Sequence, residues 1–122
     1  MSRRSIGLAA EDYVAAALAG RGWRLLARNL RTPYAEVDLL AREPSGTLVL
    51  VEVKARHPLA FLGGEDHLTA RQRRRLEAAM QWLAGREPAA CGLRLDLAVV
   101  QHARGQILSV ELLEGLAAIE PA

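Results

Sequence analysis

The stretch from residue 34 to residue 56 constrains the fold more than any other part of the chain. Its sequence is YAEVDLLAREPSGTLVLVEVKAR, two apolar runs on either side of a Pro-Ser-Gly turn, which is typical of an antiparallel hairpin. Side chains two apart share a strand face, so folding about Ser45 places Leu40 opposite Leu50 and Asp38 opposite Glu52. Carboxylates facing each other across two strands repel and destabilise a sheet. The hairpin therefore predicts a compensating partner, either a shared proton or a bound cation.

A single lysine lies beside these acids. Lys54 follows Glu52 by two residues on the same strand face, and the other cationic residues of the chain are all arginine. Lysine is a compact ammonium whose pKa shifts readily, whereas arginine stays protonated. Two acids and a lysine on one face favour a divalent-metal site with a proton-handling partner. The alternative is a solvated ladder of surface charges. Leu40, Leu48 and Leu50 lie on that same face, which argues against a fully solvated face.

Length and composition set the class of protein. A chain of 122 residues, 51% hydrophobic and 25% charged, fits one globular domain over residues 1–122. Its one cysteine, Cys91, excludes an internal disulfide and fits a reducing compartment. No apolar run reaches the length of a membrane span. We therefore expect a cytoplasmic protein with no membrane partner.

The segments outside the hairpin alternate between helical and extended patterns. Five are predicted: helices over residues 5–19 and 69–86, and strands over residues 23–31, 93–102 and 107–113. Thr69 and Gln72 form a capping box for the second helix, and the small apolar tail to Ala122 suggests a short packing helix. This order predicts an α/β fold: an antiparallel three-strand meander, then a helical crossover that makes the fourth strand parallel to its neighbour.

Further candidate residues lie on the two predicted helices. Glu11 shares a stripe with Leu8, Ala15 and Leu18, where a carboxylate is costly unless it is paired or bound to metal. An edge position from which Glu11 reaches water is an equal alternative. Cations near a helix start oppose the helix dipole, so a cluster there suits polyanion binding, or it simply solvates one face. That cluster consists of Arg71, Arg73, Arg74 and Arg75.

Taken together, these residues resemble a known family. Asp38 followed by Glu52-Val53-Lys54 is similar to the PD-(D/E)xK signature of the restriction-endonuclease-like superfamily. More narrowly, the chain resembles the small bacterial YraN-type proteins, which are similar to archaeal Holliday junction resolvases. The matching stretches are residues 7–12, 28–31, 36–39, 51–56 and 94–96. The chain departs from the family pattern at Ala35, where glycine is usual, and at Arg71, where lysine is usual.

The resemblance implies a restriction-endonuclease-like α-β-β-β-α-β core, with a central mixed sheet flanked by helices. It also implies a nuclease that uses Mg²⁺ or Mn²⁺ to hydrolyse DNA, including branched, Holliday-junction-like DNA. Asp38, Glu52 and the Val53 carbonyl would hold the ion, Glu11 would be the additional acid, and Lys54 would orient the attacking water. The expected nucleic-acid contacts are Arg28, Arg31, Arg56, Arg71, Arg73, Arg74 and Arg75.

Other functions remain open at the level of sequence. Resolvase-like enzymes commonly act as dimers, so a homodimer is one expectation. The same scaffold could serve as a nucleic-acid-binding or assembly module without turnover. A third alternative is a protein-interaction domain that uses Phe61 in the loop of residues 57–67.

Overall fold

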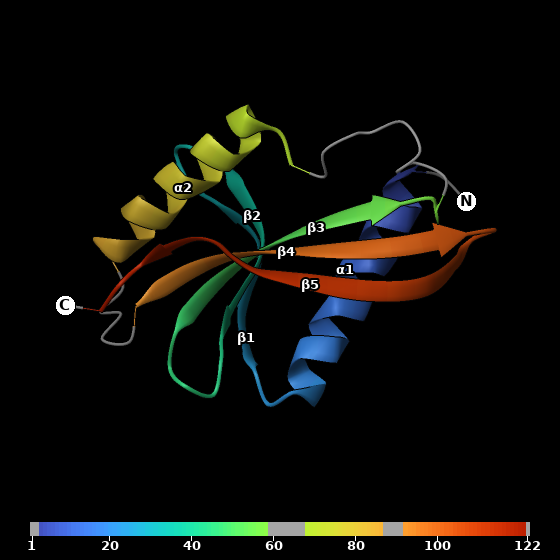
Figure 1. The fold of residues 1–122 in the computed structure, drawn as a ribbon, viewed down its shortest axis with the longest axis horizontal. Coiled ribbons are helices and arrows are strands. Elements are labelled where there is room, and N and C mark those ends of the chain that lie inside the picture. Colours follow the sequence, from blue (N-terminus) through green and yellow to red (C-terminus); the bar gives the residue numbers. More distant parts are fainter. Residues whose placement is uncertain (1–2, 59–67, 87–91, 122) are drawn as a thin grey trace.

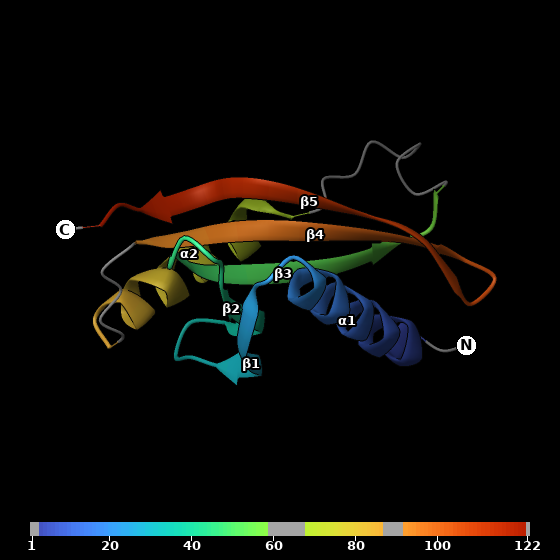
Figure 2. The ribbon, with the colours of Figure 1, turned by 90° about the horizontal axis from the view of Figure 1, so that it is seen from below.

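The described part of the protein is a five-stranded mixed sheet with two helices. The computed structural model describes residues 3–58, 68–86 and 92–121. Its elements are α1 (Arg3–Gly20), β1 (Arg24–Arg31), β2 (Glu36–Arg42), β3 (Leu48–Arg56), α2 (Ala70–Ala84), β4 (Leu93–Ala103) and β5 (Gln106–Ile119). The strands follow one another from β1 at one edge to β5 at the other (Figures 1 and 2). Only β3 and β4 run parallel, so the expected meander, crossover and α/β core are confirmed.

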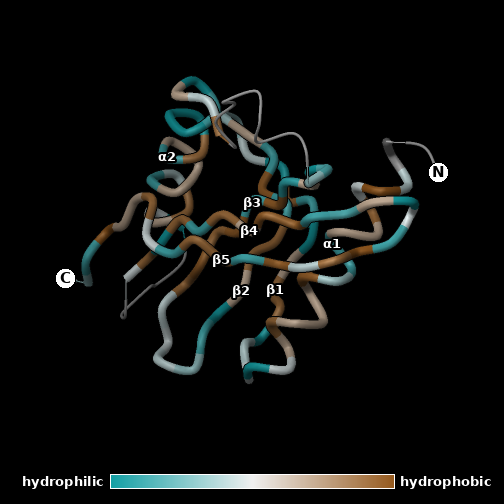
Figure 3. Tube along the Cα trace, turned by 45° about the vertical axis from the view of Figure 1, so that its right-hand side comes forward, coloured by the Kyte–Doolittle hydropathy of each residue, from teal (hydrophilic) through white to brown (hydrophobic). Residues whose placement is uncertain are grey.

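Two hydrophobic clusters cover opposite faces of the sheet. Val49 and Val51 of β3 pack with α1, and Leu48 and Leu50 pack with α2, because neighbouring strand residues point to opposite faces. We call these groups the α1-side and α2-side clusters. The most hydrophobic stretches of chain accordingly run through the central strands (Figure 3). No helix in the described ranges has the length and apolar character needed to cross a membrane.

The second helix follows its sequence signals closely. The Thr69 hydroxyl accepts the Gln72 N–H at 3.1 Å, and the Gln72 side chain accepts the Thr69 N–H at 3.0 Å, which is the predicted capping box. The buried stripe of α2 consists of Leu76, Ala79, Met80 and Leu83. These residues recur at helical spacing, so the apolar pattern alone determines which face packs on the sheet.

The first helix has a different buried stripe from the predicted one. Ala10, Val14 and Leu18 are buried at intervals of four residues, whereas Leu8 is 50% exposed. Glu11 lies beside this stripe and is partly buried. The small side chain of Ala10 lets α1 pack closely on the sheet, so Ala10 is buried in place of the larger Leu8 that the sequence pattern favours.

The predicted C-terminal helix is wrong, because β5 continues to Ile119. After Leu113 pairs with Leu97, the register shifts, and Ile119 then pairs with Leu93. Gly115 absorbs the shift with a φ of 75°, in the left-handed region that glycine enters without steric cost. Ladder hydrogen bonds along β4 therefore override the helical propensity of the small residues in this tail.

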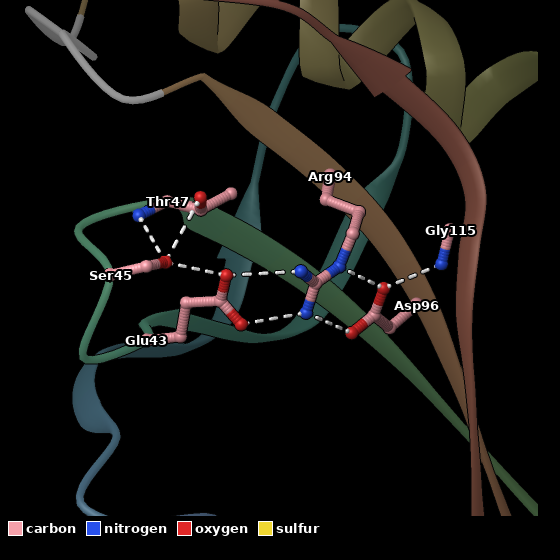
Figure 4. Close-up of polar contacts among 6 residues, drawn as sticks. All are labelled: Glu43, Ser45, Thr47, Arg94, Asp96 and Gly115. Carbon is pink, nitrogen blue, oxygen red and sulfur yellow. Dashed lines mark hydrogen bonds and ion pairs between the residues drawn. The ribbon is translucent and has the colours of Figure 1, made fainter.

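A network of charged side chains joins β4, β5 and the turn after β2 (Figure 4). Asp96 is fully buried and accepts two hydrogen bonds from Arg94, at 2.8 and 3.0 Å, and one from the Gly115 N–H at 3.0 Å. Arg94 also donates two hydrogen bonds of 3.0 Å to Glu43. Burial tends to raise the pKa of Glu43, but hydrogen bonds from Arg94 and Ser45 outweigh it and lower the pKa. Residues two apart on a strand share a face, so the sequence predicts that Arg94 and Asp96 can pair, and this pairing is confirmed.

Removing Asp96 should destabilise the fold strongly. Asp96→Ala leaves Arg94 with Glu43 as its one carboxylate partner and removes the acceptor of the Gly115 N–H, which should cost about 3 kcal/mol. Glu77→Ala is the matched control, because it breaks only the exposed Arg73–Glu77 pair and should cost less than about 1 kcal/mol. Urea unfolding followed by circular dichroism measures both. Equal small losses in the two variants would contradict the structural role of this network.

Candidate functional site

The site begins where β2 separates from β3. The ladder between them has the predicted register and consists of Arg42–Leu48, Ala41–Val49, Leu40–Leu50 and Leu39–Val51. Beyond it, the Val53 N–H donates to Asp38 Oδ2 at 2.8 Å, so a side chain serves as the acceptor in place of the main chain. β2 meanwhile stays paired with β1 through Val37 and Glu36. The two strands therefore part at Asp38, the position that the sequence marked.

The alternation of β2 also changes at this point. Strict alternation predicts that Val37, Leu39 and Ala41 share one face of the strand. Leu39 and Ala41 do pack together in the α1-side cluster, but Val37 packs in the α2-side cluster, so the prediction is wrong for Val37. The change falls at Asp38, where β2 leaves the β3 ladder and is held only by β1.

Glu52 and Lys54 form a poorly hydrated ion pair next to Asp38. Their side chains are only 13% and 20% exposed, and Lys54 Nζ lies 3.4 Å from Glu52 Oε1. Burial, followed by the negative charge of Asp38, raises the pKa of Glu52 to about 8, although Lys54 opposes the shift. Glu52 is therefore protonated more easily than an ordinary glutamate, so either a proton or a cation can relieve its repulsion with Asp38. The carboxyl groups of Asp38 and Glu52 thus lie close enough to interact, as the hairpin register predicts.

Glu11 approaches the same region from α1. Its side chain is 15% exposed and lies 3.8 Å from Arg28 Nη2. Burial and then the charge of Asp38 raise the pKa of Glu11, while Arg28 and Asn29 lower it in part. With its amide nitrogen turned toward the acids, Asn29 lies 3.3 Å from Glu11 Oε1 and 3.3 Å from Glu36 Oε1. Asn29 thus links an acid of α1 to an acid of β2.

Asn29 is a site residue that the sequence analysis missed. It has a φ of 50°, a left-handed conformation that asparagine adopts more readily than most residues. The available signal is the polar run of residues 28–31 at a strand end, a pattern that fits the start of a turn as well as a site. The contact between Asn29 and Glu11 depends on how α1 packs against β1, and sequence spacing carries no information on that packing.

The predicted arginine contacts fall into separate groups. Arg71, Arg74 and Arg75 line an open groove of about 460 Å³ with Pro33, Tyr34 and Ala78, which we call the arginine groove. Arg73 instead donates to Glu77 Oε1 at 3.1 Å and to the Leu116 carbonyl.

The remaining predicted arginines come from β1 and β3. Arg28 pairs with Asp12 at 2.7 Å. Arg31 is an exposed residue at the end of β1, and Arg56 donates to the Ala55 carbonyl at 3.3 Å. The loop of Phe61 lies outside the described residues, so its predicted role stays a prediction.

The donor set around Asp38 suits a hard cation. Within the described ranges, no three His, Cys, Asp or Glu side chains are placed to hold one ion together, and the role of Glu11 as an additional metal ligand stays a prediction. Asp38 and Glu52 remain, and the Val53 carbonyl points toward β2 like the Val53 N–H, because both groups of a strand residue face the same side. Two carboxylates and a carbonyl fit Mg²⁺, which keeps its other positions for water and phosphate oxygens.

Comparison with known proteins gives a consistent family assignment. Residues 10–100 match the family described as "Uncharacterised protein family UPF0102". A UPF0102 protein of Paracidovorax citrulli is 42% identical over 100 residues, which cover 80% of this chain and 74% of the relative. One from Mycobacterium sp. (strain KMS) is 36% identical over 118 residues, covering 95% and 87%. A protein of unknown function from Silicibacter pomeroyi has a similar structure, with a TM-score of 0.44 and 14% identity over 96% of this chain and 75% of that chain.

The raised pKa of Glu52 predicts that the protein loses stability as the pH rises. A carboxyl group whose folded pKa exceeds its ordinary value of 4.5 favours the folded state while protonated, and this contribution is lost as the pH approaches 8. In EDTA, Tm should fall by roughly 5 °C or more between pH 5 and pH 8.5. Glu52→Gln should flatten this dependence, and Glu77→Gln on exposed α2 should not. Parallel Tm profiles for wild type and Glu52→Gln would contradict the burial of a proton at Glu52.

Proposed function

The chain belongs to Uncharacterised protein family UPF0102, the YraN-type proteins, and we propose that it is a divalent-metal-dependent nuclease that hydrolyses DNA phosphodiester bonds. One observation carries the proposal. The carboxyl groups of Asp38 and Glu52 are held together beside Lys54 at the point where β2 leaves β3. Repulsion between two neighbouring carboxylates destabilises a sheet, and a bound cation would remove that repulsion.

The residues of the site have separate tasks in this proposal. When bound, the ion would lower the pKa of a water ligand and neutralise charge on the scissile phosphate. The Val53 N–H fixes the Asp38 carboxylate, whose second oxygen can still accept a ligand. Lys54, held 3.4 Å from Glu52, keeps a compact positive charge where it can orient a water molecule and stabilise charge that develops on phosphate oxygens.

The basic surface beside the acids supports DNA as the substrate. A smaller pocket of about 170 Å³ is lined by Glu36, Glu52 and Gln72 and shares Tyr34 and Arg75 with the arginine groove. A DNA strand whose phosphates lie on these arginines would therefore pass close to Glu52. Release of counterions from the phosphates would supply affinity without sequence preference.

A second function is favoured by one observation. Because the pKa of Glu52 is raised to about 8, a proton can relieve the repulsion between the acids at neutral pH without any metal. The same scaffold could then be a nucleic-acid-binding or assembly module that performs no hydrolysis. Metal binding, measured apart from activity, distinguishes these two functions.

Cleavage should depend on the acids and the lysine. With Mg²⁺ and either linear or branched DNA, we expect Asp38→Asn, Glu52→Gln and Lys54→Met to lose at least ~100-fold in rate, because each removes a ligand or a proton-handling group. Glu77→Gln, purified in the same way, is the control and should cleave like wild type. Gel electrophoresis of labelled substrates measures the rates. Equal cleavage by every variant would identify a contaminating nuclease and defeat the assignment.

Metal affinity should increase with pH. The ion must displace the proton of Glu52, so the association constant for Mn²⁺ should rise about tenfold per pH unit between pH 6 and pH 8. Isothermal titration calorimetry of wild type, with Asp38→Asn as the control that lacks one ligand, measures this dependence. If no binding is measurable at pH 8.5 while salt-sensitive DNA binding persists, the protein is the non-catalytic module.

A further inference from the structure

The arginine groove contains one aromatic ring that the proposed catalysis does not use. Tyr34 lines the groove from the turn between β1 and β2, whereas the arginines line it from α2, and its side chain is 52% exposed. Tyr34 also lines the smaller pocket that contains Glu52. The residue is therefore common to the basic groove and to the pocket of the acids.

The backbone beneath Tyr34 forms a tight, rigid turn. Thr32 Oγ1 accepts the N–H groups of Tyr34 at 3.2 Å and Ala35 at 3.0 Å, and it donates to the Ala35 carbonyl at 2.7 Å. The Thr32 N–H donates to the same carbonyl at 3.0 Å. Pro33 adds a fixed φ within the turn. Because the backbone is already fixed, only the two side-chain torsions of Tyr34 have to be ordered when a ligand stacks on its ring.

The α2 side of the groove carries positive charge that the described part of the protein does not neutralise. Arg71, Arg74 and Arg75 recur at helical spacing, so they share one face of α2. In residues 3–58, 68–86 and 92–121, the ion pairs involve Arg28, Lys54, Arg73 and Arg94, and no carboxylate pairs with these three arginines. Guanidinium groups without a carboxylate partner are well suited to bind phosphate oxygens.

An exposed aromatic ring in the same groove as several cations matches an unpaired nucleotide better than a duplex. In a duplex both faces of each base are covered by neighbouring bases, and basic side chains alone suffice to hold the backbone. A base outside a duplex exposes its π-face, which can stack on an aromatic side chain whatever its sequence. Tyr34 adds nothing to the binding of paired DNA but can add substantially to the binding of a single strand.

We propose that the arginine groove binds an unpaired nucleotide next to the scissile phosphate, with its base stacked on Tyr34 and its phosphates held by Arg71, Arg74 and Arg75. This inference rests on the proposed nuclease, because the groove leads to Glu52, and it names the substrate class. The preferred DNA carries a single-stranded segment that adjoins a duplex.

Binding without cleavage tests the groove. In EDTA, a short single-stranded oligonucleotide containing 2-aminopurine is titrated with protein, and its fluorescence reports base stacking. Tyr34→Ala should weaken binding about tenfold or more and abolish the quenching, because one stacked base is lost. Tyr34→Phe keeps the ring and should restore both. The preference of wild type for a duplex with a single-stranded extension over a blunt duplex should also disappear in Tyr34→Ala.

The adjacent arginines provide the matched control. Arg74→Ala should weaken binding and reduce the slope of log affinity against log salt by about 0.7, the value for one phosphate contact with a single strand. Arg73→Ala removes the same charge one residue away, but Arg73 is held by Glu77 and the Leu116 carbonyl, so it should retain most of the affinity. Unchanged quenching by Tyr34→Ala, or equal losses for Arg73→Ala and Arg74→Ala, would overturn the proposal.

The outcome is separable from that of the nuclease proposal. Binding that depends on Tyr34, in a wild type that never cleaves, would support the groove and count against the nuclease alone. Cleavage of an extended duplex at the same rate by wild type and Tyr34→Ala would overturn the groove alone.

Discussion

The candidate site depends on one hydrogen bond, from the Val53 N–H to the Asp38 carboxylate. A buried N–H without an acceptor is costly, so β2 could not leave β3 at this point unless another acceptor replaced its main chain. Asp38 fulfils that requirement, and the strand separation follows. The separation in turn admits Glu11 and Asn29 from one side and Glu52 from the other. The Asp38 side chain thus accepts the last hydrogen bond between β2 and β3 and also places an acidic group where the two strands separate.

Two groups of charged side chains on the sheet differ in how well they are paired. Asp96 and Arg94 join the start of β4 to the turn after β2, and both oxygens of the Asp96 carboxylate have a donor. That group is electrostatically satisfied. The group that holds Asp38 and Glu52 is not, because two neighbouring acids share a single ammonium and the pKa of Glu52 rises. A pKa shifted by burial and by a specific neighbouring charge is typical of a functional site.

The sequence predicted the parts of the fold that local patterns determine. The hairpin register followed from its turn and its apolar alternation, and α2 followed from a capping box and a helical stripe, because each signal lies within a few residues of its effect. What the sequence could not supply were contacts between distant segments. Glu43 meets Arg94 across 51 residues, Asn29 meets Glu11 through helix packing, and the C-terminal tail becomes a strand only because β4 offers it a ladder. The carboxylate pair could be predicted from the sequence, but its arginine surroundings only in part. Arg73 and Arg74 are the same residue type, yet Arg73 bonds to Glu77 and the Leu116 carbonyl while Arg74 lines the groove.

The placement of the one lysine has a practical consequence. All other permanent cations are guanidinium groups, which do not react with amine-directed acylating reagents under mild conditions. The only side-chain amine is the one beside Glu52, and it is largely shielded from solvent. The rate at which such a reagent modifies this amine therefore reports directly on the charge and occupancy of the acidic pair, and any ligand that enters the space would be visible as protection from labelling.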